Sequence, residues 1–235
     1  MSLHHIISIA SSDRRQTFIN LHDGKTRVTS THEKHKNTPS AFPLVLACLT
    51  ACPAWALEPC RASNVYIEGV DRIIDRAVGR SPELALTVLP SFEAEYGVRM
   101  IGADVYLVQL RRSFWARSVV ADGPRSYHHD FRHVRVGTSI HQASLSPEVA
   151  ARVRQHYARA ISAAKQSVPV GLDGTTYRFV VKATGCGETW SPQAKSANGQ
   201  LVALAELLAG HARRGSSLSR LQSEEKILRA IAGGQ

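Results

Sequence analysis

The sequence predicts an α+β fold for residues 57–235, a single domain in which a small antiparallel sheet packs with three to four helices. The sheet is expected to consist of a three-strand meander plus a two-strand hairpin, because short alternating stretches rich in β-branched and aromatic residues occur in two groups. Longer stretches with apolar residues at helical spacing stand before, between and after these groups. Regular β-α-β alternation and a glycine-rich phosphate loop are missing from the sequence, which argues against nucleotide chemistry on a doubly wound sheet.

The first half of this domain is expected to form one helix followed by the meander. The apolar stripe of the helix follows the i, i+3, i+4, i+7, i+8 pattern at Val70, Ile73, Ile74, Ala77 and Val78. Gly79 and Pro82 should end it. The three strands are expected within residues 83–92, 95–102 and 104–115. In the third, Val105 and Leu107 should face one side and Tyr106, Val108 and Leu110 the other, so we expect this strand to be the most central.

The second half is expected to form a helix, two strands and two more helices. Residues 120–146 are polar and irregular, and no strand is expected there. Ser146, Pro147 and Glu148 are typical of a helix start, and this helix should run to Lys165. Residues 171–190 predict two strands and a turn, with Cys186 in the turn or at the start of the second strand. The last two helices are expected over the apolar positions from Leu201 to Ala212, closed by Gly215, and from Glu224, capped by Ser223, to a point before Gly233.

The segment in front of this domain resembles a secretory signal. Residues 41–56 contain an apolar run that is far shorter than the roughly 20 residues needed to span a bilayer. Pro53 and the small-x-small triplet that ends at Ala56 follow the run, so we expect cleavage after Ala56. Residues 1–40 are unusually long for the start of a signal and should be unstructured, or they reflect a start codon placed too early, with Val28 as the true start.

Two other interpretations of the same run stay open. Residues 49–52 resemble a lipobox, which would make Cys52 a lipidation site and the chain an inner- or outer-membrane lipoprotein. The run could also be a buried segment of a cytosolic protein. The expected location is periplasmic or secreted, and the mature chain should have no transmembrane helix.

The cysteine count favours one structural disulfide. Removal of the signal leaves Cys60 and Cys186, the even number expected in an oxidising compartment. A catalytic role for Cys186 would need a base that lowers the pKa of its thiol, and no histidine is near it in sequence. The two positions also lack the ligand spacing of a zinc site.

A histidine cluster is the part of the sequence that could carry chemistry. His128, His129 and His133 lie close together with Asp130, and imidazoles with a carboxylate can hold zinc. Adjacent histidines usually point apart, so we expect a solvated polar loop and no metal site. Glu188 is a weak candidate for a general acid because no second carboxylate is visible near it in sequence.

The basic composition is compatible with an acidic partner. The chain has a formal net charge of +10, which permits binding to an acidic envelope polymer, an anionic lipid or an acidic protein, and no nucleic acid is expected. The helix that starts at Pro147 should present Arg152, Arg154 and Arg159 on its solvent face. Trp115 and Trp190 each end a predicted strand, where an aromatic ring either caps the core or lines a binding face.

Two functions are therefore considered. The first is an exported envelope protein that acts as a non-enzymatic binding or structural module with a basic surface and needs no cofactor. The alternative is a small extracytoplasmic hydrolase that uses His128, His129 and His133, with or without zinc. Common hydrolase signatures such as the nucleophile elbow and HExxH are missing after Ala56, which favours the first.

Overall fold

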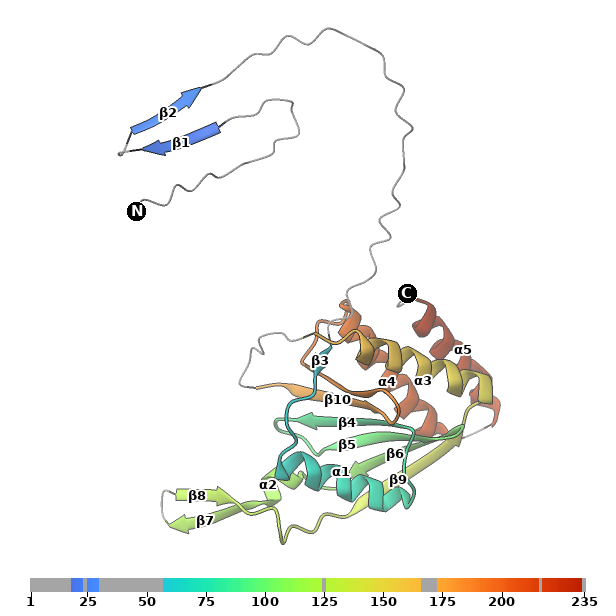
Figure 1. The fold of residues 1–235 in the computed structure, drawn as a ribbon. Helices are drawn as coiled ribbons and strands as arrows, with labels where there is room; N and C mark the ends of the chain where they lie inside the picture. The colour runs from blue at the N-terminus through green and yellow to red at the C-terminus, as the bar shows by residue number, and fades with distance from the viewer. Residues whose placement is uncertain are drawn as a thin grey trace, which may run out of the picture. The chain divides into compact units, whose positions relative to one another are not determined.

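The computed structural model describes residues 18–22, 25–29, 57–123, 126–165, 173–215 and 217–233. The chain divides into two units, residues 1–49 and 50–235. In the first unit, β1 (Phe18–His22) pairs in antiparallel fashion with β2 (Lys25–Thr29), within the stretch that was expected to lack structure (Figure 1). The predicted secretory segment at 41–56 and the lipidation candidate Cys52 lie outside the described residues.

The second unit contains helices and an antiparallel sheet. Its helices are α1 (Val65–Val78), α2 (Phe114–Arg117), α3 (Pro147–Ser162), α4 (Ala197–Arg214) and α5 (Ser217–Gly233). Its strands are β3 (Glu58–Pro59), β4 (Leu84–Pro90), β5 (Tyr96–Ile101), β6 (Asp104–Leu110), β7 (Val119–Gly123), β8 (Ser126–His129), β9 (Thr138–Ser144), β10 (Thr175–Val181) and β11 (Gly185–Trp190). None of the helices in the described ranges has the length and apolar character needed to span a membrane.

The predicted small sheet is wrong. The structure has one 7-stranded antiparallel sheet with the strand order β3-β11-β10-β4-β5-β6-β9 (Figure 1). The expected meander and hairpin merge because β10 pairs with β4, for example at Phe179 opposite Leu86. As a result β4 is the middle strand, and β6, which was expected to be central, lies next to the edge strand β9. Pairing between segments so far apart in sequence depends on main-chain hydrogen bonds, which leave no pattern in the residue types.

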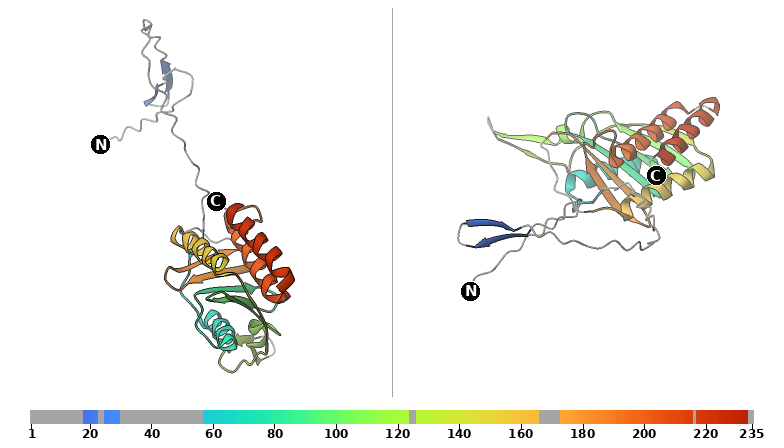
Figure 2. Two further views of the ribbon diagram at one scale, coloured as in Figure 1. Left: turned by 90° about the vertical axis from the view of Figure 1, so that its right-hand side faces the viewer. Right: turned by 90° about the horizontal axis from the view of Figure 1, so that it is seen from above.

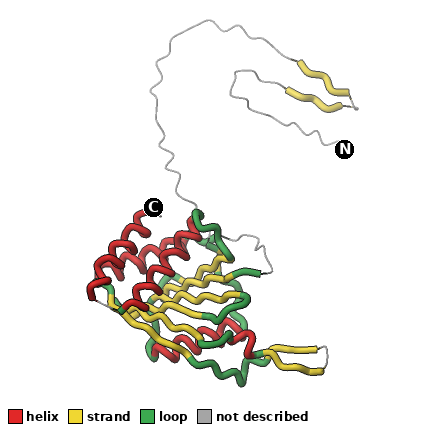
Figure 3. The backbone as a smooth tube through the Cα atoms, turned by 180° about the vertical axis from the view of Figure 1, so that it is seen from behind, coloured by secondary structure: helices red, strands yellow, loops and turns green. Residues whose placement is uncertain are grey.

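The stretch 120–146 was also expected to lack strands, and this is wrong. The hairpin β7–β8 begins just before it, and β9 lies within it and pairs with β6 along its whole length. β8 and β9 carry mainly polar residues, and all three strands are exposed or half-exposed. Figure 3 shows β7 and β8 as a two-stranded arm that extends away from the main sheet. Such strands form by main-chain pairing and lack the apolar alternation of a buried strand.

Helices cover both faces of the sheet (Figures 1 and 2). On one face, Leu86, Val98 and Phe179 contribute to the larger core together with Tyr157 of α3 and Leu204 of α4, and α5 adds Ile227 and Ile231. On the other face, a smaller cluster joins α1 to β4 and β6. The two predicted sides of β6 are confirmed, because Val105 and Leu107 belong to the first cluster and Val108 and Leu110 to the second.

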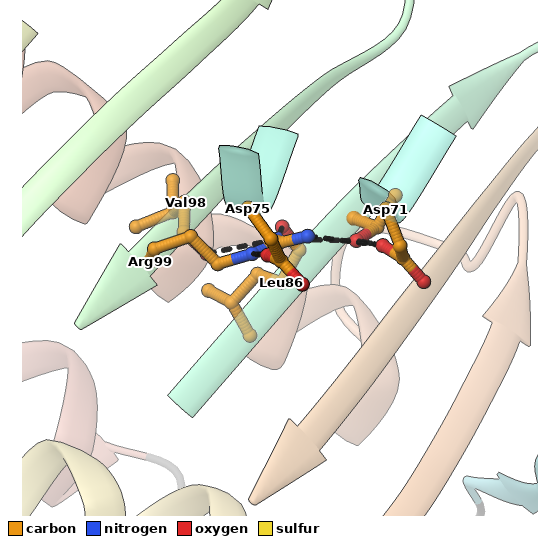
Figure 4. A network of polar contacts seen from close by, with 6 residues as sticks. Asp71, Asp75, Leu86, Val98 and Arg99 are labelled. Atoms are coloured by element: carbon orange, nitrogen blue, oxygen red, sulfur yellow. Dashed lines mark hydrogen bonds and ion pairs between the residues drawn. The ribbon is translucent and has the colours of Figure 1, made fainter. Parts of the chain in front are cut away.

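A buried arginine fixes α1 to the sheet (Figure 4). The side chain of Arg99 on β5 is only 1 % exposed. Its guanidinium donates to Asp75 at 2.6 Å and to Asp71 at 3.0 Å, both on α1, and to the carbonyl oxygen of Leu86 at 2.9 Å. A buried charge is tolerated when it is paired and hydrogen-bonded in this way. The network therefore sets the position of α1, and with it the position of the segment that leads into the helix from β3.

The predicted helix boundaries are partly confirmed. Gly79 closes α1 in the left-handed conformation, α3 begins at Pro147, and Gly215 closes α4. The last helix begins at Ser217, well before the predicted Glu224. The one-turn helix α2 was not predicted, because four residues are too few to show helical periodicity.

Candidate functional site

The predicted disulfide is confirmed and lies at the edge of the sheet. Cys60 and Cys186 are bonded, with their Cα atoms 5.4 Å apart. Cys60 follows β3 and Cys186 lies near the start of β11, and these strands pair at Glu58 and Glu188. Because each cysteine is two residues from one of these glutamates, the bond fixes both carboxylates relative to each other.

A cleft of about 590 Å³ opens next to this bond. It is bordered by β3 and the segment leading to α1, by the start of α1, by α2, and by the ends of β4, β10 and β11. Four aromatic side chains line it: Tyr66, Phe92, Trp115 and Trp190. Four charged side chains line it as well: Glu58, Arg61, Asp173 and Glu188. We call this site the aromatic cleft. Both predicted tryptophans and the predicted glutamate meet in it, although nothing in the sequence indicated that they would.

The charged groups in the cleft partly neutralise one another. Glu188, only 6 % exposed, accepts a hydrogen bond from the backbone N–H of Arg61 at 3.2 Å, and its carboxylate lies 3.4 Å from Arg61 Nε. The same guanidinium lies 3.7 Å from the carboxylate of Glu58. The second carboxylate that the sequence did not reveal is therefore Glu58, which stands opposite Glu188 on the adjacent strand. One arginine holds the two carboxylates.

A further arginine lies in the same face of the sheet. Arg178 on β10 is opposite Glu188 on one side and Thr87 on the other. Its Nε and Nη1 atoms are buried and have no hydrogen-bond partner among the described residues. Buried donors are normally satisfied by protein, water or ligand. The polar groups at this end of the sheet are thus incompletely satisfied by the protein itself.

Trp190 lies against main chain at the edge of the cleft. A Cβ atom placed on Gly174 would be 2.6 Å from the Trp190 ring and 2.3 Å from Ser191 Oγ, so a side chain at position 174 would displace both. Ser191 has a φ of 36°, in the region that residues other than glycine rarely adopt, and its hydroxyl accepts the N–H of Thr175 at 2.9 Å. Such strain is maintained only where surrounding contacts fix it. The tryptophan is therefore held in one place.

Trp115 is positioned by a buried carboxylate, Glu95, which no sequence pattern distinguishes. Glu95 is fully buried and accepts four hydrogen bonds, from Phe114 N (2.7 Å), Tyr66 Oη (2.9 Å), Trp115 N (3.1 Å) and Ser113 Oγ (3.3 Å). Burial, and then the nearby carboxylate of Glu95, raise the pKa of Tyr66 well above its usual value, so this hydroxyl stays protonated and donates. Glu95 thereby fixes α2 and the ring that α2 carries into the cleft.

The ring of His129 packs against the ring of Trp115. Its ring centroid lies 3.9 Å from that of Trp115 and 5.6 Å from that of Phe131. Its Nδ1 is 2.7 Å from Ser118 Oγ, a geometry that resembles a catalytic serine–histidine pair. Ser118, however, is fully buried, and its hydroxyl donates to the carbonyl oxygen of Trp115 at 2.7 Å. The pair is structural, because this serine cannot reach a substrate.

The predicted histidine cluster does not converge. His128 pairs with Asp122 at 2.7 Å on the exposed hairpin, His129 lies in the aromatic cluster, and His133 is exposed elsewhere on the following loop. Across the described residues, no group of three or more His, Cys, Asp or Glu side chains is arranged to hold a metal ion.

The S-x-x-K spacing occurs twice after Ala56, at Ser162–Lys165 and at Ser223–Lys226, and Ser223 is buried and accepts a hydrogen bond from Arg214 at 3.1 Å. Ser162 and Lys165 stand in the S-x-x-K arrangement of acyl-transfer enzymes, but both are exposed at the C-terminal end of α3.

The predicted basic face of α3 is partly neutralised. Arg152 pairs with Glu148 at 2.7 Å on the same helix. Arg154 lies 3.2 Å from Glu83 and donates to the carbonyl oxygen of Gly102 at 2.5 Å. Arg159 is exposed. Two of the three arginines expected to contact a partner are therefore bound to the protein itself.

Comparison with protein-family models, curated proteins and solved structures finds no match to this chain.

Proposed function

We propose that this chain is an exported, non-enzymatic binding protein and that the aromatic cleft holds a short neutral carbohydrate. The observation that carries the proposal is that four aromatic side chains line one cleft together with charged groups that partly cancel. The C–H face of a pyranose ring is apolar and packs on aromatic rings. Its hydroxyls both donate and accept, so they can satisfy a carboxylate and a guanidinium at once.

The size and accessibility of the cleft support such a ligand. Its volume of about 590 Å³ falls within the range of roughly 300–1,000 Å³ typical of small-molecule sites. Phe92 and Trp115 both line the cleft and are 83 % and 43 % exposed, so their rings are accessible to a ligand. The three carboxylates that line the cleft disfavour an anion, and Arg61 reduces the attraction for a cation.

The disulfide supports export. Such bonds persist in oxidising compartments and are rare in the cytosol. The histidines of the hydrolase alternative lie in three separate surroundings, so the geometry favours binding over catalysis.

A fluorescence titration tests the proposal. The chain has 3 tryptophans, and the two in the described residues both line the cleft. In the full-length Trp55→Phe variant, tryptophan emission therefore reports on the cleft alone. We expect a saturable change with at least one of cellotriose, maltotriose and chitotriose, and none with benzenesulfonate or benzyltrimethylammonium.

Calorimetry on variants locates the binding. Trp115→Ala and Trp190→Ala should each weaken it by roughly tenfold, because each removes a stacking surface. Tyr127→Ala, which removes an exposed ring on the β8 strand outside the cleft, should leave affinity unchanged. Lack of response to all three sugars, or equal affinity of the tryptophan variants, would overturn the proposal.

A further inference from the structure

A second hollow lies near α2 and is lined by arginines. Its volume is about 290 Å³, and four of its six lining residues are Arg111, Arg112, Arg117 and Arg135. The other two, Val136 and Gly137, carry no charge. We call this site the arginine hollow. It shares no lining residue with the aromatic cleft.

The four guanidiniums are not paired with a carboxylate in the part of the chain that the structure describes. Among the described residues, no carboxylate lies in the lining and no ion pair or side-chain hydrogen bond involves any of the four. Several other arginines of the same domain do pair with carboxylates, among them Arg61, Arg99 and Arg154. Like charges gathered in one place repel one another, and a bound anion would offset that repulsion.

The main chain that carries these arginines is fixed. Arg111 N donates to the carbonyl oxygen of Gly137 at 2.8 Å, which ties the end of β6 to the segment before β9. A Cβ on Gly137 would lie 3.4 Å from Arg111 Cδ, so the arginine stem passes close over the glycine. Arg117 belongs to α2, whose start is held by the buried carboxylate of Glu95. Three separate segments, at residues 111–112, 117 and 135–137, thus contribute to the lining of the arginine hollow.

We propose that the arginine hollow binds a phosphoryl group. A guanidinium offers a planar pair of N–H donors that matches two oxygens of a phosphate, and several such forks can surround one tetrahedral anion. The volume of the hollow suits a single phosphate better than a large ligand. The site extends the expectation of an acidic partner, but it places the contact beside α2 and away from α3. It is independent of the carbohydrate proposal.

The test uses the full-length protein and inorganic phosphate. Isothermal titration at low ionic strength should show saturable binding that weakens as sodium chloride is added. The double variant Arg112→Gln/Arg117→Gln should weaken binding at least tenfold. The control Arg72→Gln/Arg76→Gln removes the same charge from exposed positions on α1 and should bind like the unaltered protein. Equal weakening in both double variants, or no phosphate binding to the unaltered protein, would overturn the proposal.

A second arm distinguishes a free phosphate from a lipid headgroup. Vesicles of phosphatidylcholine with phosphatidylglycerol are sedimented with the protein, with and without inorganic phosphate. Sedimentation that phosphate and the Arg112/Arg117 variant both abolish identifies a lipid headgroup as the source. Phosphate binding in solution without sedimentation identifies a free phosphate as the source. Sedimentation that the variant retains would assign membrane contact to another surface and contradict a lipid role for the hollow.

Discussion

Glu95 determines where one side chain of each candidate site lies. Its carboxylate accepts the backbone N–H groups of Phe114 and Trp115, and this interaction sets the single turn of α2. That turn carries Trp115 to the aromatic cleft and Arg117 to the arginine hollow. One buried acid therefore orients parts of two separate sites.

Glu95→Ala should destabilise the protein by at least about 2 kcal/mol, because it leaves a buried donor on Phe114 and partly buried donors on Tyr66 and Trp115 without their acceptor. Urea unfolding measures the change. Glu93→Ala removes an exposed acid from the same loop and should alter stability by no more than about 0.5 kcal/mol. If the two variants unfold at the same urea concentration, Glu95 does not hold α2.

The sequence picked out Trp115, Trp190 and Glu188 one by one, and the structure brings all three to one cleft. Glu95 escaped notice because a lone acid in a loop resembles any solvated residue. Only the fold surrounds it with donors.

At the scale of elements, amphipathic helices were predicted best. Their spacing shows which face is buried, as in α1, α3 and α4. The elements that were missed are short or lie at edges: β3, β9, the hairpin β7–β8, and α2. These depend on pairing or capping by distant residues, which a local pattern does not record.

The disulfide joins two such elements, β3 and β11, across a sequence separation of 126. Closing so long a loop in the unfolded chain should stabilise the native state by roughly 4–5 kcal/mol in the chain-entropy model. We expect reduction to lower the Tm of the oxidised protein markedly. It should also reduce ligand affinity at the aromatic cleft, because the disulfide no longer fixes Glu58 relative to Glu188. Calorimetry with and without reductant measures the first effect.

The Cys60→Ser/Cys186→Ser variant provides the control. It should melt near the temperature of the reduced protein and should not respond to reductant. A Tm that is the same for the variant and the oxidised protein would show that the bond contributes nothing to stability.

At the scale of the whole molecule, charge is unevenly distributed. The chain carries a net charge of +10, yet three carboxylates gather at the aromatic cleft and four arginines surround the other hollow. The two sites therefore suit different ligands, and a change of salt concentration should affect the second far more than the first.

The stability of the domain should fall in mild acid. Burial, and to a smaller extent the charge of Arg159, lower the pKa of His156 to about 4, and burial also lowers that of His211. The unfolded chain, with ordinary histidines near 6.5, binds protons first as the pH falls, so the stabilisation present above 6.5 is lost progressively down to about 4. Urea unfolding at a series of pH values measures this.

His156→Gln should reduce the slope of stability against pH between 4 and 6.5, because it removes one of the groups that takes up a proton on unfolding. His128→Gln, which changes an exposed histidine on the hairpin, should retain most of that slope. An unchanged slope in His156→Gln would assign the acid sensitivity to other groups.

The sequence by itself determined the cysteine pair, the two sides of β6 and the main amphipathic helices, because residue spacing and type encode these locally. It did not determine the 7-stranded sheet, the convergence of tryptophans and carboxylates, or the gathering of Arg111, Arg112, Arg117 and Arg135. Those depend on which distant strands pair and on where one buried carboxylate holds α2. Such contacts arise from main-chain hydrogen bonds and tertiary packing, which act between residues that are neighbours only in the folded chain.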